Sequence, residues 1–578
     1  MKLALHVALA ATAVALAAPS TAQVARYVNG SLTTGLSNGS SWANAHRGPD
    51  ALTVALGQTS GPNRVFVAQG TYYPSTTLDA TASFEIPAGI YLHGGFVGDE
   101  PDAQLRPARG FAPTILSGDL AQNDSLGGFG NRAENSHHVV QTITGNDRST
   151  LDRFTVTGGY AFDPAGIFEE RGGGLLCGNA TSVTDCEFVD NFAETAGGAI
   201  FSEAVTLLVQ DCQFTSNLVS PLVIGSITEG GGAIFHNGGP ARINRCRFDA
   251  NRTAGRGAAV WLGPTGSVTN SIFFGNFGAP GSAIWIDAQI DGPARVVACT
   301  LANNLAEFPG GYAIDGLPGS TTPLVSQSIL WGNISLTTST PSLNPALLAE
   351  DSIVEAGIPG PGVIDADPLF VDAMAGDLTL GSGSPAIDSS SDTQLPLDAA
   401  TADAQLRRRS VDDPMAPNAG PGGGTLDFGA LERSDSVSGV SPICFANPNS
   451  TGERGLADAY GSTSLGLNNL TLSATNLPQN AFTYFIVSRS RGFITQPGTG
   501  SLCLGGTIGR VIGPGQVQSS GALGSVQVTI DLAAIPAVTS FIAGEPGDTW
   551  YFQAWHRDFV HGSVRSNFTD AGSVTLIP

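Results

Sequence analysis

Short runs in which apolar and polar residues alternate recur along the middle of the chain. The clearest is CEFVDN at 186–191, where Cys186 and Phe188 flank Glu187. Alternation with a period of two places every second residue on one face of a β-strand. Five further copies follow: CQFTSN at 212–217, CRFDAN at 246–251, SIFFGN at 271–276, CTLANN at 299–304 and SILWGN at 328–333. The middle residue is Glu, Gln or Arg in the first three copies, so we predict that the Cys and Phe positions face the interior.

A second series of glycine-rich segments accompanies the first. Its members are GGLL at 173–176, GGAI at 197–200, GGAI at 231–234, GAAV at 257–260, GSAI at 281–284 and GYAI at 311–314. Two series that keep the same irregular spacing indicate a structural repeat. The glycines allow positive φ at a corner, and the small residues fit where successive coils crowd. The Asn that closes each unit of the first series suits either a stacked amide ladder or a turn with left-handed backbone.

These patterns predict an all-β protein built as a right-handed parallel β-helix. One repeat unit makes one coil, which cannot bury its apolar face without its neighbours, and we expect about a dozen coils. A β-propeller is the competing fold, but it would need longer blades of four antiparallel strands.

The two ends of the repeat array have different patterns. Residues 40–56 predict a short amphipathic helix with Pro49 at its first position and Leu52, Ala55 and Leu56 on one face. Such a helix would cover the open end of the first coil. After residue 435 the repeat stops, and short strands such as FTYFIVS at 482–488 predict a separate β-sandwich-like domain.

The first 22 residues have the pattern of a signal peptide. Lys2 precedes an apolar run at 3–18, and Ser20-Thr21-Ala22 forms a small-x-small cleavage signal, so we expect cleavage near Ala22. The run is short for a membrane span, and no later stretch reaches 18 apolar residues. We therefore predict a secreted protein, extracellular or at the cell surface, without a transmembrane segment.

Composition and charge exclude several classes of function. The chain has 75 glycines in 578 residues and 13% charged residues, which favours short strands and tight turns over helices. The formal net charge of −23 makes nucleic acid an improbable partner, because binding phosphates needs clustered basic residues. Lys2 is the only lysine, so the mature chain has no lysine for a phosphate-binding loop or for Schiff-base chemistry.

The paired glycine and F-x-x-N series resemble the repeat of the polymorphic outer-membrane proteins, within the right-handed parallel β-helix (pectin-lyase-like) superfamily. Upstream, VFVAQGTYYP at 65–74 and IYLHGGFVGDE at 90–100 are similar to the first coils of secreted bacterial β-helix proteins. Downstream, DADPLFVD at 365–372, GSPAID at 383–388 and DFGALE at 427–432 resemble a choice-of-anchor Q region. The resemblance implies a fold and says hardly anything about activity.

The expected organisation has five parts. They are a signal peptide at 1–22, an N-terminal cap with the first coils at 23–110, the β-helix at 111–435 with the choice-of-anchor Q region at 361–435, a linker at 436–442, and the C-terminal β-sandwich-like domain at 443–578.

The cysteines divide into two groups. Cys186, Cys212, Cys246 and Cys299 occupy the inward repeat position, where we expect free buried thiols. Cys444 and Cys503 are the only pair in the C-terminal domain of an exported chain, so we predict a disulfide between them. Cys177 is left over.

Carboxylates are the candidates for catalysis or metal binding. Glycoside hydrolysis needs two of them about 5–9.5 Å apart. The candidates near turns or strand ends are Asp190, Asp249, Asp287 and Asp315, and the candidate Ca²⁺ ligands are Asp365, Asp367 and Asp372. The alternative interpretation is that these residues form turns and solvated faces. No H-E-x-x-H or C-x-x-C occurs, so zinc is unsupported.

We expect a non-catalytic adhesin or binding protein, monomeric, that engages an extracellular glycan or a surface protein and needs no cofactor other than, at most, Ca²⁺. A distributed acidic surface would suit cation-bridged adhesion with avidity from the repeat. The alternative is a polysaccharide lyase or glycoside hydrolase with a carboxylate or Ca²⁺-dependent site on the β-helix face. Against it, the sequence shows no histidine or lysine beside the candidate carboxylates to tune their pKa values.

Overall fold

The structure is a computed structural model that describes residues 25–578 apart from several stretches. These are 59–62, 101–105, 108–109, 126–128, 163–169, 221–229, 279, 288–293, 308–310, 318–321, 336–341, 391–401, 406–408, 410–415, 422, 434–440, 445, 447–448, 452–453, 496–500, 522–523 and 561–562. The predicted signal peptide and residues 436–440 of the predicted linker lie outside the described residues.

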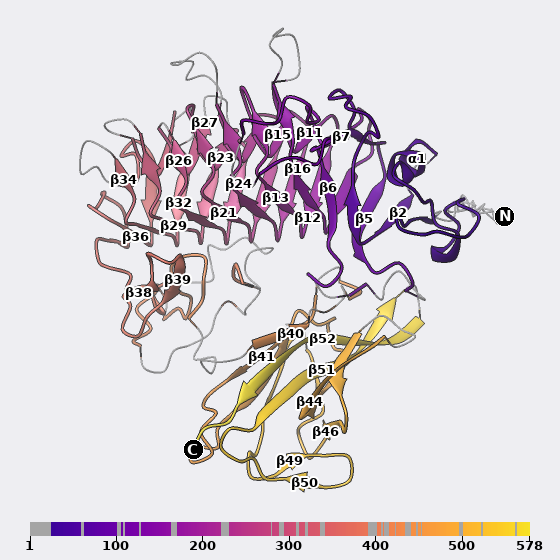
Figure 1. The fold of residues 1–578 in the computed structure, drawn as a ribbon. Helices are drawn as coiled ribbons and strands as arrows, with labels where there is room; N and C mark the ends of the chain where they lie inside the picture. Colours follow the sequence, from indigo (N-terminus) through magenta and orange to yellow (C-terminus); the bar gives the residue numbers. More distant parts are fainter. Residues whose placement is uncertain are drawn as a thin grey trace, which may run out of the picture.

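Residues 25–364 wind into four parallel sheets, A to D, which confirms the predicted right-handed parallel β-helix (Figure 1). Sheet A has eleven strands: β1 (Ala25–Val28), β2 (Arg64–Ala68), β5 (Tyr91–Phe96), β8 (Ser149–Asp152), β12 (Thr181–Thr184), β16 (Leu207–Gln210), β20 (Ala241–Asn244), β24 (Ser267–Thr269), β28 (Arg295–Val297), β32 (Leu324–Ser326) and β35 (Leu348–Glu350). Sheet B also has eleven: β3 (Gly70–Tyr72), β6 (Thr114–Ser117), β9 (Thr155–Thr157), β13 (Glu187–Val189), β17 (Gln213–Thr215), β21 (Arg247–Asp249), β25 (Ile272–Phe274), β29 (Thr300–Ala302), β33 (Ile329–Trp331), β36 (Ser352–Val354) and β37 (Val363–Ile364).

The other two sheets complete each coil. Sheet C contains β4 (Phe84–Ile86), β7 (Val140–Thr142), β11 (Leu175–Cys177), β15 (Ile200–Ser202), β19 (Ile234–His236), β23 (Val260–Leu262), β27 (Ile284–Asp287) and β31 (Ile314–Leu317). Sheet D contains the two-residue strands β10 (Tyr160–Ala161), β14 (Phe192–Ala193), β18 (Leu218–Val219), β22 (Arg252–Thr253), β26 (Phe277–Gly278), β30 (Leu305–Ala306) and β34 (Ile334–Ser335). A coil passes through sheets C, A, B and D in turn.

Residues at equivalent positions of the sequence repeat pair with one another between successive coils. Phe188 pairs with Phe214, which pairs with Phe248 and then Phe273. The four rings are fully buried and stack face to face, with centroids 5.2, 4.8 and 4.6 Å apart. These separations match the spacing of neighbouring strands, about 4.8 Å, so each ring packs on its equivalents above and below.

A ladder of buried asparagine amides runs beside the rings. Its members are Asn191, Asn217, Asn251, Asn276, Asn304 and Asn333. The Nδ2 atom of each of the first five members donates to the Oδ1 of the next at 2.8–3.1 Å, and the backbone N–H of the same residue donates to the same oxygen. The left-handed residue of this turn is the one before the asparagine, for example Asp190 with φ 53°. The asparagines therefore serve the amide ladder and not the left-handed position.

The predicted first copy of the glycine series, at 173–176, begins one residue after the structural repeat. Leu175 pairs with Ile200, so Gly172 (φ 69°) is the counterpart of Gly197 (φ 62°). The repeat segment is 172–175 and not 173–176. The cause is the run of three glycines at 172–174, which fits the pattern in two registers.

The N-terminal end is covered by the predicted helix, which begins later than expected. The 3-10 helix η1 (Trp42–Asn44) precedes α1 (Ala51–Gly57), and Asp50 occupies the N-cap position. Pro49 therefore lies before the cap and not at the first helical position. Leu52, Ala55 and Leu56 are buried, as predicted, and α1 packs against β1, β2 and β4.

The segment after the last coil folds back over the β-helix. It contains the antiparallel pair β38 (Phe370–Asp372) and β39 (Asp377–Leu380). Apolar residues of this segment cover outward-facing residues at the C-terminal end of sheet B, in contacts that include Leu380 and Phe428 against Ile329 and Ile353. The outer face of sheet B is therefore partly occupied.

The C-terminal domain is an antiparallel sandwich. One sheet contains β40 (Ser441–Cys444), β52 (Ser563–Thr575), β51 (Thr549–Val560), β43 (Phe482–Ser488), β46 (Gly509–Val511) and β47 (Gln518–Ser519). It packs against β41 (Leu456–Tyr460), β42 (Thr471–Thr475) and β48 (Val526–Thr529) around a shared apolar core. Two hairpins complete the domain: β44 (Ser490–Thr495) with β45 (Ser501–Gly505), and β49 (Ile535–Pro536) with β50 (Phe541–Ile542).

The cysteines have the expected states. Cys444 and Cys503, the pair predicted to be bonded, form a disulfide. The free cysteines are Cys177, Cys186, Cys212, Cys246 and Cys299, and all five are buried. Burial raises the pKa of Cys177 and of Cys299 to about 12, so both stay protonated.

The helices of the described chain are short. None of them has the length and apolar character needed to cross a membrane.

We predict that Phe214→Ala lowers the free energy of unfolding by about 3–5 kcal/mol, because it removes one ring from the middle of a stacked core column. Urea unfolding monitored by circular dichroism measures the change. Phe111→Ala is the control, since that side chain is 72% exposed and its removal should cost little. A loss below about 1 kcal/mol at Phe214 would contradict the core assignment.

Candidate functional site

Ten strands of sheet A present one side chain each at the same outward position. We call this row the sheet A strip: Arg64, Tyr91, Thr150, Ser182, Leu208, Arg242, Ser267, Arg295, Leu324 and Leu348. All ten residues are exposed or half-exposed. Because neighbouring strands lie about 4.8 Å apart, the strip is a straight row about 43 Å long.

The strip is positively charged in an acidic protein. It carries three arginines and no carboxylate, although the whole chain has a net charge of −23. Within the described residues, neither Arg64 nor Arg295 has an ion-pair partner. The expectation of a distributed acidic binding surface therefore does not hold for this face.

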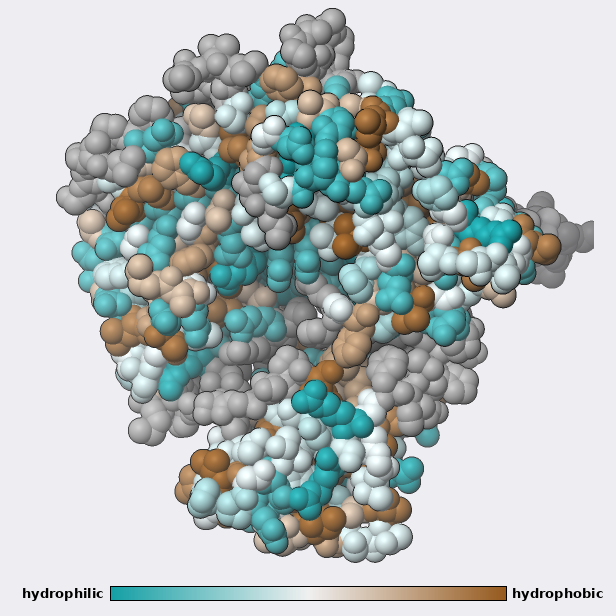
Figure 2. Space-filling view, in the orientation of Figure 1, coloured by the Kyte–Doolittle hydropathy of each residue, from teal (hydrophilic) through white to brown (hydrophobic). Residues whose placement is uncertain are grey.

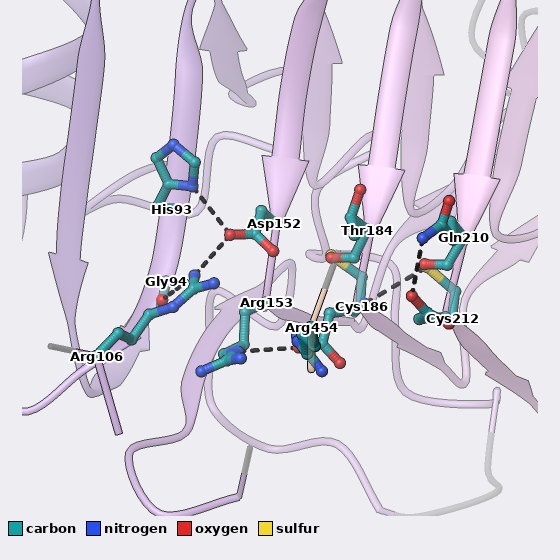
Figure 3. Close-up of polar contacts among 12 residues, drawn as sticks. His93, Gly94, Arg106, Asp152, Arg153, Thr184, Cys186, Gln210, Cys212 and Arg454 are labelled. Atoms are coloured by element: carbon teal, nitrogen blue, oxygen red, sulfur yellow. Dashed lines mark hydrogen bonds and ion pairs between the residues drawn. The ribbon is translucent and has the colours of Figure 1, made fainter. Parts of the chain in front are cut away.

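A buried ion cluster adjoins the strip at its N-terminal end. His93 Nδ1 lies 2.9 Å from Asp152 Oδ2, and Arg106 Nη1 lies 2.6 Å from the same oxygen (Figure 3). Arg106 also donates to the carbonyl oxygen of Gly94 at 3.0 Å. Burial alone would raise the pKa of Asp152, but Arg106 and His93 together hold it well below its usual range.

The His93 imidazole packs between Asp152 and Phe66. Burial lowers its pKa, partly opposed by Asp152, and its ring stacks on Phe66 with centroids 5.6 Å apart. Asp152 accepts a hydrogen bond from the Nδ1–H group, which fixes the orientation of the ring. Local sequence patterns do not reveal this pair, because the two residues are 59 positions apart in coils without the repeat signature. Extending the strand register upstream, where His93 pairs with Asp152, would have found it.

A charged column continues from this cluster along the turns that follow sheet A. Its members have left-handed backbone and occupy consecutive coils: Arg153, Asp185, Asp211 and Arg245. Arg153 Nε lies 2.9 Å from Asp185 Oδ2, and Arg245 Nε lies 2.7 Å from Asp211 Oδ1. Arg454 of the C-terminal domain reaches into the column and donates to Asp185 Oδ2 (Figure 3). The column is therefore a point of contact between the two parts of the chain.

Two of the four predicted catalytic carboxylates lie apart from the others. Asp190 occupies the left-handed position of the turn between β13 and β14, and its backbone oxygen accepts a hydrogen bond from Arg132. Asp249 lies on β21 in sheet B, and its Oδ2 is 2.7 Å from Arg247 Nε.

The other two, Asp287 and Asp315, lie on neighbouring strands of sheet C. Asp315 pairs with Trp285 in the register, so Asp287 is its diagonal neighbour two residues on. Asp315 is buried and accepts hydrogen bonds from Asn344 Nδ2 at 2.6 Å and from Gly316 N at 2.7 Å. Burial raises its pKa. Of the predicted carboxylates, this pair is the one that the coil register brings together.

A column of aromatic rings leads to this pair along the outer face of sheet C. It consists of Phe201, Phe235, Trp261 and Trp285, all buried. Phe201 stacks on Phe235 with centroids 5.2 Å apart, and Phe235 stacks on Trp261 at 4.4 Å. Arg256 lies over the ring of Trp285 at 4.3 Å. Because the ring faces are already occupied, this column offers no open platform for stacking.

The predicted Ca²⁺ ligands serve local turns. Asp365, Asp367 and Asp372 accept hydrogen bonds from the backbone N–H groups of Ala356, Leu369 and Ala375 at 3.3, 2.8 and 3.1 Å. In the described part of the chain, no group of three or more His, Cys, Asp or Glu residues is placed to hold a metal ion.

The chain resembles solved structures but no family model or curated protein. No family model matches the chain, and no curated protein matches it. Among solved structures, the chain is similar to "Crystal structure of pectate lyase Pel9A", with 13% sequence identity and a TM-score of 0.40 over 71% of this chain and 96% of that one. A likeness of this degree says nothing about the activity of the present chain.

We predict that Asp152→Asn lowers the free energy of unfolding by about 3–5 kcal/mol at pH 7, because Arg106 is left largely buried without its carboxylate. The folded-state pKa of Asp152 is depressed, so its contribution is complete above the unfolded pKa, about 3.9, and is lost as the pH falls through the lower folded value. The difference between variant and wild type should therefore shrink below about pH 4. Urea unfolding at several pH values tests this, with the exposed Asp147→Asn as control. A difference that stays constant with pH would contradict the ion-pair assignment.

Proposed function

We propose that this protein is exported and binds an acidic glycan strand along the sheet A strip, without altering it chemically. The observation that carries the proposal is the row of three arginines, free of carboxylates, on the open face of a sheet. The predicted signal peptide supports export, and a ligand in the extracellular space would meet this face directly.

The chemistry of the strip fits an extended anionic ligand. A guanidinium forms paired hydrogen bonds with carboxylate or sulfate groups. Arg242 and Arg295 are separated by one strand, which places them about 9.6 Å apart along the row. Tyr91, Leu208 and Leu324 are half-exposed between and beside the charges and supply apolar contact for sugar rings. Several weak contacts along one extended glycan chain together raise its affinity through avidity.

We predict that the triple variant Arg64→Gln, Arg242→Gln, Arg295→Gln binds an acidic polysaccharide such as polygalacturonate at least about 10-fold more weakly than wild type, which corresponds to about 1.4 kcal/mol. Single variants should lose only part of this affinity. Calorimetry at several salt concentrations measures both the affinity and its salt dependence, and the salt dependence should fall in the triple variant.

The matched control removes the same charge from exposed arginines of the C-terminal domain: Arg510→Gln, Arg557→Gln and Arg565→Gln. If both triple variants bind equally, or if neutral polysaccharides bind as tightly as acidic ones, the strip is not the binding site. Tight binding of an acidic protein with none to polysaccharides would assign a protein partner in place of the glycan.

A second candidate function is glycoside hydrolysis, which the pair Asp287 and Asp315 favours. Hydrolysis needs one carboxyl group that holds a proton beside a second that does not. The raised pKa of Asp315 is the observation that supports the first role. Incubation with acidic and neutral polysaccharides, followed by assays for new reducing ends and for unsaturated uronates, tests hydrolysis and elimination together. Turnover that disappears in Asp315→Asn and Asp287→Asn but persists in Asp249→Asn would replace binding with catalysis.

A further inference from the structure

We propose that Arg454 is an electrostatic latch that holds the C-terminal domain against the β-helix, and that the two parts separate when salt weakens this contact. The inference concerns the arrangement of the molecule and is independent of the ligand proposed for the strip. It rests on the charged column, on the contacts between the two parts, and on the charge balance of each part alone.

The column contains one step at which like charges are neighbours. Asp185 and Asp211 occupy consecutive coils, because the residues before them, Thr184 and Gln210, pair in the register. Equivalent positions in neighbouring strands lie about 4.8 Å apart, so the two carboxylates repel each other. Arg454 supplies a positive charge at this step. It donates to Asp185, and its guanidinium is stabilised by the charges of both Asp185 and Asp211.

The rest of the interface between the β-helix and the C-terminal domain has little apolar contact. In the described residues, every hydrophobic cluster lies wholly on one side, either in residues 25–433 or in the C-terminal domain. Figure 2 shows hydrophilic residues in the hollow of the β-helix face above the C-terminal domain, and residues of both kinds where that domain begins. Apolar burial therefore contributes little to holding the two parts together, and the ion pair has a correspondingly large share.

The ion pair between Arg454 and Asp185 is largely shielded from solvent. The Asp185 side chain is 1% exposed and that of Arg454 is 14% exposed. Water weakens a pair of this burial less than a surface pair, so the closed contact is strong; salt acts on the separated state, in which both charges meet solvent. Arg153 and Arg245 each pair with one of the two aspartates, so removal of Arg454 takes away the charge that the C-terminal domain adds at this step.

Each part keeps a balanced charge when the contact opens. On the β-helix, the ion cluster and the column contain three arginines and three aspartates: Arg106, Arg153, Arg245, Asp152, Asp185 and Asp211. On the other side, Arg454 also interacts with Asp570 of its own domain. Opening the contact therefore leaves each aspartate of the β-helix with an arginine, while Arg454 becomes accessible to water.

Small-angle X-ray scattering on the full chain tests the latch. At about 20 mM NaCl the wild type should be compact, and its radius of gyration should rise toward about 1 M NaCl, where charges are screened within about 3 Å. Arg454→Gln should have the larger radius already at low salt and show no further rise. The exposed Arg510→Gln removes the same charge elsewhere and should behave as wild type. Circular dichroism checks that each variant is folded.

Two results would overturn the proposal. One is an Arg454→Gln variant that is folded and has the same radius and salt response as wild type. The other concerns Arg454→Lys, which keeps the charge but loses the planar guanidinium and should expand at a lower salt concentration than wild type. An unchanged midpoint in that variant would reject the latch even if Arg454→Gln does not fold.

Discussion

The in-register stacking of coils is the constraint on which the rest of the molecule depends. Because each coil lies directly over the last, a residue at one position meets its equivalents at a separation of about 4.8 Å. In that geometry, equivalent residues of successive coils form columns. Examples are the rings that include Phe214, the amides that include Asn251, the charges that include Asp185, and the sheet A strip that includes Arg242. Side chains that stack well on their own kind therefore suit the interior, whereas like charges at one position need partners from elsewhere.

The sequence predicted those parts of the fold in which one residue type repeats at one position. The amides around Asn251 recur in all six units and the rings around Phe214 in the first four, so their neighbours followed from the alignment. The buried face of α1 followed from local periodicity. The first residue of that helix did not follow from it. Asp50 is the N-cap, so the helix begins at Ala51, two residues after the predicted start at Pro49.

The contacts that the sequence could not predict join residues without a shared repeat. His93 and Asp152 meet only when the register is extended into coils whose sequences have diverged. Arg454 and Asp185 are 269 positions apart and belong to different folding units, so no local pattern connects them. The charge of the strip was hidden for another reason: a net charge is a sum over the chain, and it says nothing about one row of side chains. Of the candidate carboxylates, only Asp287 and Asp315 became neighbours, since adjacency needs both the same sheet and a nearby register position.

The amide ladder has a consequence for how the protein can change in length. Every interior asparagine donates to one neighbour and accepts from the other, so the two ends of a coil are complementary and any coil can follow any other. Duplication or loss of a whole coil would leave the ladder continuous, whereas an insertion of a few residues inside a strand would break it. The β-helix can therefore evolve by whole coils, and each added coil would lengthen its outer faces by about 4.8 Å without altering the coils already present.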